Sequence, residues 1–169
     1  GWGNALVSKA RTKKVASAAI LYRESFDKYA KAVEVKPNYG GAFYNWAYAL
    51  YYLAKINNSE QYFNEACEKY EQVLRIEPTY HQAWRNWGIT LRELAGMKKS
   101  KELYYQAIEK FAKAVEIKFD KTEAILDWEI TLKELAEITE DESEKKELIR
   151  EADEKHRMLE EIRKLNNIE

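Results

Sequence analysis

Apolar residues recur along most of the chain at the spacing of one face of an α-helix. Between Trp84 and Ala95 they fall three or four positions apart, and a second such series runs from Tyr104 to Val115. This period predicts two amphipathic helices joined by a short turn. Applied to the whole chain, it predicts no strand and eight helices, with approximate bounds 2–12, 16–35, 40–55, 59–76, 81–95, 98–117, 122–138 and 141–166.

The hairpin pattern repeats with a step of 41 residues, most visibly in Trp46, Trp87 and Trp128. The same step relates closely similar runs that precede Pro37 and Pro78, so we interpret each repeat as one helical hairpin. The last helix is dense in Glu and Lys, as a terminal helix that faces water should be. The predicted divisions are a truncated first repeat at 1–37, repeats at 38–78 and 79–119, and a fourth repeat with a C-terminal capping helix at 120–169.

Candidate N-cap residues recur with the repeat. Asn38, Thr79 and Asp120 stand where the first helix of each hairpin should begin, and Ser59 precedes a second helix. Short polar side chains at such positions accept hydrogen bonds from the first backbone N–H groups of a helix. Gln82 follows Thr79 by three residues, which is the spacing of a capping box.

These repeats resemble the tetratricopeptide repeat family over nearly the whole chain. The departure is length, because the family's usual repeat has 34 residues and this one has 41, which an added turn on each helix would accommodate. The resemblance implies a single all-α domain over 1–169, a right-handed superhelical solenoid of antiparallel helix pairs. Matching residues in the third repeat are Trp84, Trp87, Gly88, Leu91, Ala107, Phe111, Ala114 and Phe119.

Function in this family usually lies in the concave groove lined by the first helix of each pair. Tyrosine rings on one face would give a ligand contact area and hydroxyl groups, while the alternative is that some of them pack between neighbouring helices. We expect the amides to bond a ligand's backbone and the arginines to accept its acidic groups. The predicted groove residues are Asn4, Tyr44, Asn45, Tyr48, Tyr51, Tyr52, Gln82, Arg85, Asn86, Ile89, Arg92 and Lys133.

One subclass of the family binds chaperone C-termini through a carboxylate clamp of Lys, Arg and Asn side chains. Asn4 and Asn45 match its two amide positions, but Gln82 and Asn86 stand where the clamp needs cations. The clamp is therefore incomplete in this sequence, and we do not expect chaperone-tail binding.

Composition argues against several other classes. With 28 Lys and Arg against 29 Asp and Glu, the chain has no overall attraction for nucleic acid. Cys67 is the one cysteine, which excludes a disulfide framework, fits a reducing compartment and is expected to be a buried, inert thiol. His81 and His156 lie in different repeats, so we expect no catalytic pair, no metal site, no cofactor and no enzymatic activity.

The leading hypothesis is therefore an interaction adaptor that binds a protein or peptide partner. The first alternative is a structural spacer or self-associating segment of a longer repeat protein, joined through exposed terminal repeats. It is motivated by a basic start, eight Lys or Arg against three acidic residues in 1–36, and an acidic end, eight against sixteen in 122–169.

The second alternative is a domain like an organellar protein-import receptor, by likeness to the elongated repeats of the plant-type receptor. That role would need a membrane anchor, whereas no apolar run here approaches the roughly 18 residues of a spanning helix. We expect no direct membrane insertion of this segment. Because it begins inside a repeat, we expect it to be a trimmed fragment whose compartment is not determined.

Overall fold

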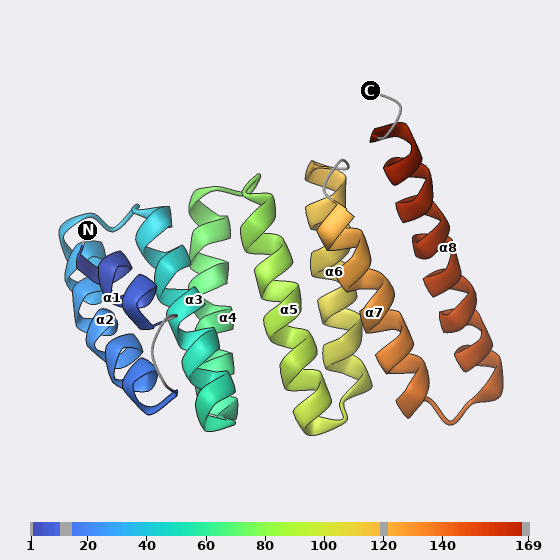
Figure 1. The fold of residues 1–169 in the computed structure, drawn as a ribbon, viewed down its shortest axis with the longest axis horizontal. Helices are drawn as coiled ribbons and strands as arrows, with labels where there is room; N and C mark the ends of the chain where they lie inside the picture. Colours follow the sequence, from blue (N-terminus) through green and yellow to red (C-terminus); the bar gives the residue numbers. More distant parts are fainter. Residues whose placement is uncertain (1, 11–14, 119–121, 167–169) are drawn as a thin grey trace. The chain divides into compact units, whose positions relative to one another are not determined.

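The computed structural model describes residues 2–10, 15–118 and 122–166 (Figure 1). Within these ranges it contains eight α-helices and no strand, which confirms the predicted all-α class of paired helices. The chain divides into two compact units, residues 1–83 (unit 1) and residues 84–169 (unit 2). In the part of the chain described, no helix combines the length and apolar character that crossing a membrane requires.

Unit 1 contains α1 (Trp2–Ala10), α2 (Val15–Val35), α3 (Gly40–Asn57) and α4 (Glu60–Ile76). Consecutive helices run antiparallel and pack side by side, α1 on α2, α2 on α3 and α3 on α4 (Figure 1). α1 also contacts α3. The first helices of the first two hairpins therefore meet directly, with α2 packed against both.

Aromatic side chains make up much of the core of unit 1. Tyr22 and Tyr29 on α2 are buried, as are Phe63 and Tyr70 on α4, and Leu53 on α3 is fully buried. Each such side chain contributes on the order of 1.5–3 kcal/mol when it leaves water. The periodic aromatic residues of the sequence thus hold the hairpins together.

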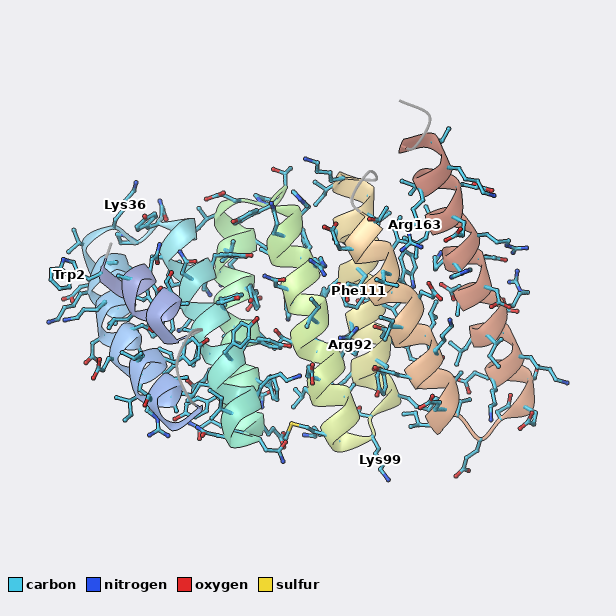
Figure 2. All side chains as sticks on the ribbon, viewed as in Figure 1. Trp2, Lys36, Arg92, Lys99, Phe111 and Arg163 are labelled. Atoms are coloured by element: carbon cyan, nitrogen blue, oxygen red, sulfur yellow. The ribbon has the colours of Figure 1, made fainter. Side chains whose placement is uncertain are left out.

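Unit 2 contains most of α5 (His81–Lys98), which begins in the last residues of unit 1, together with α6 (Lys101–Ile117), α7 (Thr122–Ile138) and α8 (Glu142–Asn166). α6 packs on α7, and α7 packs on α8. α5 meets α6 at Gly88, where a Cβ atom would stand 2.7 Å from the ring of Phe111 (Figure 2). The small residue of the repeat therefore permits close approach of these two helices.

The turn between the two helices of a hairpin recurs in the second and third repeats. Asn58 and Lys99 have left-handed backbone conformations, with φ of 48° and 50°, and end α3 and α5. Ser59 and Ser100 follow them, and each hydroxyl accepts a hydrogen bond from the backbone N–H three residues on. At the start of α8, the carboxylate of Asp141 accepts a hydrogen bond from the backbone N–H of Glu144. Ser59 is confirmed as an N-cap, and α5 extends three residues beyond its predicted end because the turn comes later.

The predicted N-caps of the first helices are wrong where the structure describes them. Tyr39 and Tyr80 immediately precede α3 and α5, so Asn38 and Thr79 lie one residue too early. The backbone N–H of each tyrosine donates to the carbonyl three residues back, which makes the intervening residues part of a tight turn. Asp120 lies outside the described residues.

Candidate functional site

An open hollow of about 330 Å³ lies between α1 and α3 in unit 1. Four of the predicted groove residues line it, Asn4 from α1 and Tyr44, Asn45 and Tyr48 from α3. They come together because α1 and α3 are neighbours and because residues four apart share a helix face. The remaining lining residues are Val7, Ser8 and Tyr29, so amide, hydroxyl and ring groups converge on one space.

Tyr29 on α2 lines the hollow from the second helix of its hairpin. Its hydroxyl donates a hydrogen bond of 2.9 Å to Oδ1 of Asn4. The side chain is 4% exposed, and burial raises the pKa of its phenol far above the ordinary tyrosine value. The hydroxyl therefore stays protonated and fixes the orientation of the Asn4 amide.

The α3 residues of the hollow are held by contacts within unit 1. The ring of Tyr44 meets Tyr70 edge-on, with ring centroids 6.0 Å apart, and lies 5.0 Å from Tyr80. Asn45 donates from Nδ2 to the carbonyl of Gly41 at 2.8 Å. These contacts hold a ring and an amide at the edge of the hollow before any ligand arrives.

Tyr48, Tyr51 and Tyr52 show how the row of tyrosines divides. Tyr48 lines the hollow, and its hydroxyl donates to that of Tyr52 at 3.1 Å. Tyr52 stacks on Tyr22 of α2, whereas Tyr51 meets Phe63 of α4 edge-on at 6.0 Å. Tyr51 and Tyr52 are half-buried and pack between helices, as the alternative reading of the tyrosine row anticipated.

The predicted cations of the third repeat are already paired within unit 2. Arg85 donates from Nε to Oδ2 of Asp127 at 2.6 Å, and Nη1 of Arg92 lies 3.6 Å from Oδ1 of the same carboxylate. Arg92 also lies 3.9 Å from Glu134. An acidic ligand would have to compete with Asp127, so the ligand-binding role of the two arginines stays a prediction.

A smaller hollow of about 290 Å³ lies beside this ion-pair cluster and is lined by Arg92, Tyr104 and Glu134 among others. Burial raises the pKa of the Glu134 carboxyl above its usual value, and the charge of Arg92 opposes this shift. Burial likewise raises the pKa of Tyr104. Glu93 also lines this hollow, so two carboxyl groups stand against the single cation Arg92, and the lining does not favour an acidic ligand.

The remaining predicted groove residues are placed individually. Gln82 is exposed in the first turn of α5, within unit 1. Asn86 and Ile89 are half-buried on α5 in unit 2. On α7, Lys133 donates to Oε1 of the buried Glu129 at 2.6 Å. These side chains do not contribute to the lining of the hollow in unit 1.

Sequence reasoning did not anticipate how the repeated tryptophans are used. A lysine from the second helix of the hairpin lies over each ring, with its Nζ atom 3.9–4.5 Å from the ring centroid. Such cation–π contacts are worth roughly 0.5–1 kcal/mol when exposed. Lys69 and Lys110 are separated by the 41-residue step, so the repeat in the sequence could have indicated these lysine–tryptophan pairs. The pairs are Trp46 with Lys69, Trp87 with Lys110, and Trp128 with Lys155.

The cysteine and histidines behave as separate groups. Cys67 is half-buried rather than buried as expected. His81 lies in unit 1, and His156 in unit 2 lies 3.3 Å from Glu129. Among the described residues, no group of three His, Cys, Asp or Glu side chains is placed to hold a metal ion.

The structures that resemble this chain are helical proteins of low sequence identity. A crystal structure of MamA is 15% identical, covers 88% of this chain and 92% of its own, and gives a TM-score of 0.49. A second crystal structure of MamA is 16% identical, covers 96% of this chain and 90% of its own, and gives a TM-score of 0.49. The crystal structure of the de novo designed helical repeat protein DHR64 is 14% identical, covers 96% of this chain and 93% of its own, and gives a TM-score of 0.44.

No protein-family model matches the sequence, and no curated protein matches it either. The all-α helical-repeat fold therefore rests on the internal repeat and on the helix packing within each unit. Membership of the tetratricopeptide family stays a prediction.

Proposed function

We propose that this chain is a protein-interaction module that binds a segment of a partner protein in the hollow between α1 and α3. The observation that carries the proposal is the convergence of Asn4, Tyr44, Asn45 and Tyr48 on one open space. Their side chains come from two helices that a 41-residue repeat brings together.

The chemistry of the lining favours a peptide ligand. The described lining residues carry no formal charge, and their amide and hydroxyl groups can bond the N–H and C=O groups of an extended backbone. The rings of Tyr44 and Tyr48 offer apolar area with little loss of side-chain freedom. The ligand is therefore an uncharged stretch of polypeptide with at least one apolar side chain.

The experiment is capture of partners by the immobilised 169-residue chain, followed by titration of the captured partner against variants. We expect Asn45→Ala together with Tyr48→Ala to weaken binding about 10-fold or more, since central interface tyrosines each contribute about 1–2 kcal/mol. Gln61→Ala is the matched control, because Gln61 is exposed on α4 and donates only to its neighbour Glu65. Thermal unfolding of each variant verifies that it is folded.

Equal affinity of the double variant and the Gln61→Ala control for the captured partner would contradict the proposed hollow. If both variants bind the partner more weakly than the original chain does, and to the same extent, the binding surface lies elsewhere. Only selective loss in the Asn45 and Tyr48 variant supports the proposal.

Self-association is the second candidate, and exposed apolar side chains favour it. Trp2 is 82% and Val35 87% exposed in unit 1, and Leu165 is 67% exposed in unit 2. A second copy can cover such side chains where they lie together on the surface. Sedimentation velocity at several concentrations separates the candidates, because the interaction module stays monomeric without its partner and a self-associating segment grows.

A further inference from the structure

The hollow of about 290 Å³ in unit 2 lies among three helices, and all its described lining residues belong to that unit. α5 contributes Arg92, Glu93, Gly96 and Met97, α6 contributes Tyr104, and α7 contributes Glu134. Gly96 is exposed and Met97 is 39% exposed, so this side of the hollow faces solvent. A side chain from another molecule can therefore enter the hollow beside Met97.

Tyr104 brings a buried hydroxyl group to this hollow. The residue is only 5% exposed, and a Cβ atom added to Gly96 would lie 3.5 Å from the hydroxyl oxygen. The hydroxyl thus points to the side of the hollow that the exposed Gly96 forms. Among the described residues, no group forms a hydrogen bond with this hydroxyl. Buried hydroxyl groups are nearly always hydrogen-bonded, so this one is placed to bond a group that enters the hollow.

Carboxyl groups outnumber cations around the hollow. Glu93 and Glu134 line it, and Arg92 is the one cation in its described lining (Figure 2). Arg92 lies 3.9 Å from Glu134 and 3.6 Å from Asp127, so its charge is divided between two carboxylates. Burial raises the pKa of Glu134, and the charges of Glu93 and Glu137 raise it further. The electrostatic environment of the hollow therefore favours a positively charged ligand.

The placement of the acceptors fits an ammonium group. An ammonium group has three N–H donors and no acceptor, and the hollow presents acceptors from three helices. These are Glu93 on α5, Tyr104 on α6 and Glu134 on α7. Each carboxylate can accept more than one hydrogen bond, so an ammonium group can join contacts that already exist. The apolar stem of a lysine side chain would lie against Met97 at the open side.

We propose that this hollow receives a lysine side chain from a partner protein, with its ammonium group bonded by Tyr104 and Glu134 and its methylene stem against Met97. An arginine fits less well, because its planar guanidinium group directs its donors in a fixed fork, whereas the acceptors here stand on three separate helices. The site goes beyond the proposed function, because it lies in the other unit and recognises a cation rather than an uncharged stretch of polypeptide.

The probe is the capped tripeptide acetyl-Ala-Lys-Ala-amide, added to the intact chain with ¹³C in its methionine methyl groups. The chain has two methionines, of which Met97 lines the hollow and Met158 packs against a separate apolar cluster of unit 2. We expect millimolar peptide to give a saturable NMR shift of the Met97 methyl signal, with no shift of Met158. The shift should weaken as the salt concentration rises. A peptide with norleucine in place of lysine keeps the stem without the charge and should leave both signals unchanged.

Tyr104→Phe provides the decisive comparison, because it removes the hydroxyl and keeps the buried ring. The free energy of unfolding should stay the same, since the hydroxyl bonds no described group. Binding of the lysine peptide should weaken about tenfold, because hydrogen bonds to charged groups are among the stronger ones. Glu134→Gln should weaken binding to a similar extent. Glu161→Gln is the matched control, because Glu161 is exposed on α8 and does not line the hollow, and it should leave binding unchanged.

Four results would each overturn the proposal: an unshifted Met97 signal, equal shifts from the norleucine peptide, unchanged binding to Tyr104→Phe, or a lowered stability of that variant. Binding of the corresponding arginine peptide as tight as that of the lysine peptide would also count against it. Tighter binding of pentylamine than of the lysine peptide would assign the hollow to a small amine instead of a partner protein. The variant that combines Asn45→Ala with Tyr48→Ala should bind the lysine peptide as the original chain does, so this proposal and the proposed function fail independently.

Discussion

Replacing Gly88 by alanine tests the close approach of α5 and α6 in unit 2. The added Cβ atom would stand 2.7 Å from Cε1 of Phe111 and 2.9 Å from its Cδ1 and Cζ atoms. Phe111 is 0% exposed, so its ring is enclosed by other side chains that must shift if it moves. Forcing an extra methyl group into a packed core costs typically 1–3 kcal/mol. Alanine in a helix gains about 1 kcal/mol over glycine, which opposes this cost.

Gly96→Ala is the matched control on the same helix. A Cβ atom there would lie 3.5 Å from the hydroxyl of Tyr104, an ordinary contact, and Gly96 is exposed. Because both variants gain about the same helix propensity, the difference between them isolates the clash with Phe111. We expect Gly96→Ala to stabilise the protein by about 0.5–1 kcal/mol and Gly88→Ala to be about 1–3 kcal/mol less stable than Gly96→Ala.

Urea unfolding followed by circular dichroism measures both free energies of unfolding, and the melting temperature should move about 2–4 °C for each kcal/mol. Equal stability of Gly88→Ala and Gly96→Ala would refute the reasoning, because it would mean that α5 does not lie against Phe111.

Three further changes have expected outcomes. Lys99→Gly should raise the free energy of unfolding by about 1 kcal/mol in urea titration, because Lys99 has a φ of 50° that glycine adopts without strain (Figure 2); an unchanged midpoint would count against the left-handed turn. Asp127→Ala should lower the free energy of unfolding by roughly 1–3 kcal/mol, since Arg85 and Arg92 both lose the carboxylate with which they pair. Stability equal to that of the original chain would show that the cluster is not formed. Hydrogen bonds from Lys101 and Tyr105 lower the pKa of the Glu144 carboxyl, so its contribution to stability is present above the ordinary glutamate pKa and is lost as the pH falls through the lowered value. Glu144→Gln should therefore make acid unfolding less steep below about pH 4.5, and an identical pH profile of the two proteins would contradict that contribution.

Helix periodicity was sufficient to predict the number, type and approximate bounds of the helices in the described parts of the chain. Apolar spacing reports the face that each helix buries, and the 41-residue step reports which helices are equivalent. The predicted starts of α3 at residue 40 and of α5 at residue 81 are correct, but their N-cap residues were missed because Asn38 and Thr79 are good cap residues in isolation. Asn38 and Thr79 belong to the tight turn that follows each preceding helix, so the residue before the next helix is Tyr39 or Tyr80.

The candidate site was predictable only in part. Periodicity placed Asn4, Tyr44, Asn45 and Tyr48 on neighbouring first helices, and they line one hollow. It could not separate Tyr48 from Tyr52, because the two differ by one helical turn and their environments depend on which neighbouring helix supplies a ring. Tyr22 of α2 supplies that ring to Tyr52.

Ion pairs between repeats were beyond the reach of single-helix patterns. Arg85 and Asp127 are 42 residues apart, and Arg85 was predicted to line the groove from its own first helix. The packing of successive hairpins brings the two side chains within 2.6 Å, which leaves the arginine engaged before any ligand binds. A search for opposite charges one repeat apart would have found this pair.

Site-specific photo-crosslinking can show whether a partner segment binds between α1 and α3. A benzophenone side chain is introduced at position 48, or at position 105 as the control, since Tyr105 is exposed in unit 2 and its hydroxyl donates to Glu144. With the partner captured by the original chain, we expect crosslinks from position 48 that Asn45→Ala reduces, and few from position 105. Crosslinks from position 105 and none from position 48 would show that the partner does not bind in the hollow between α1 and α3.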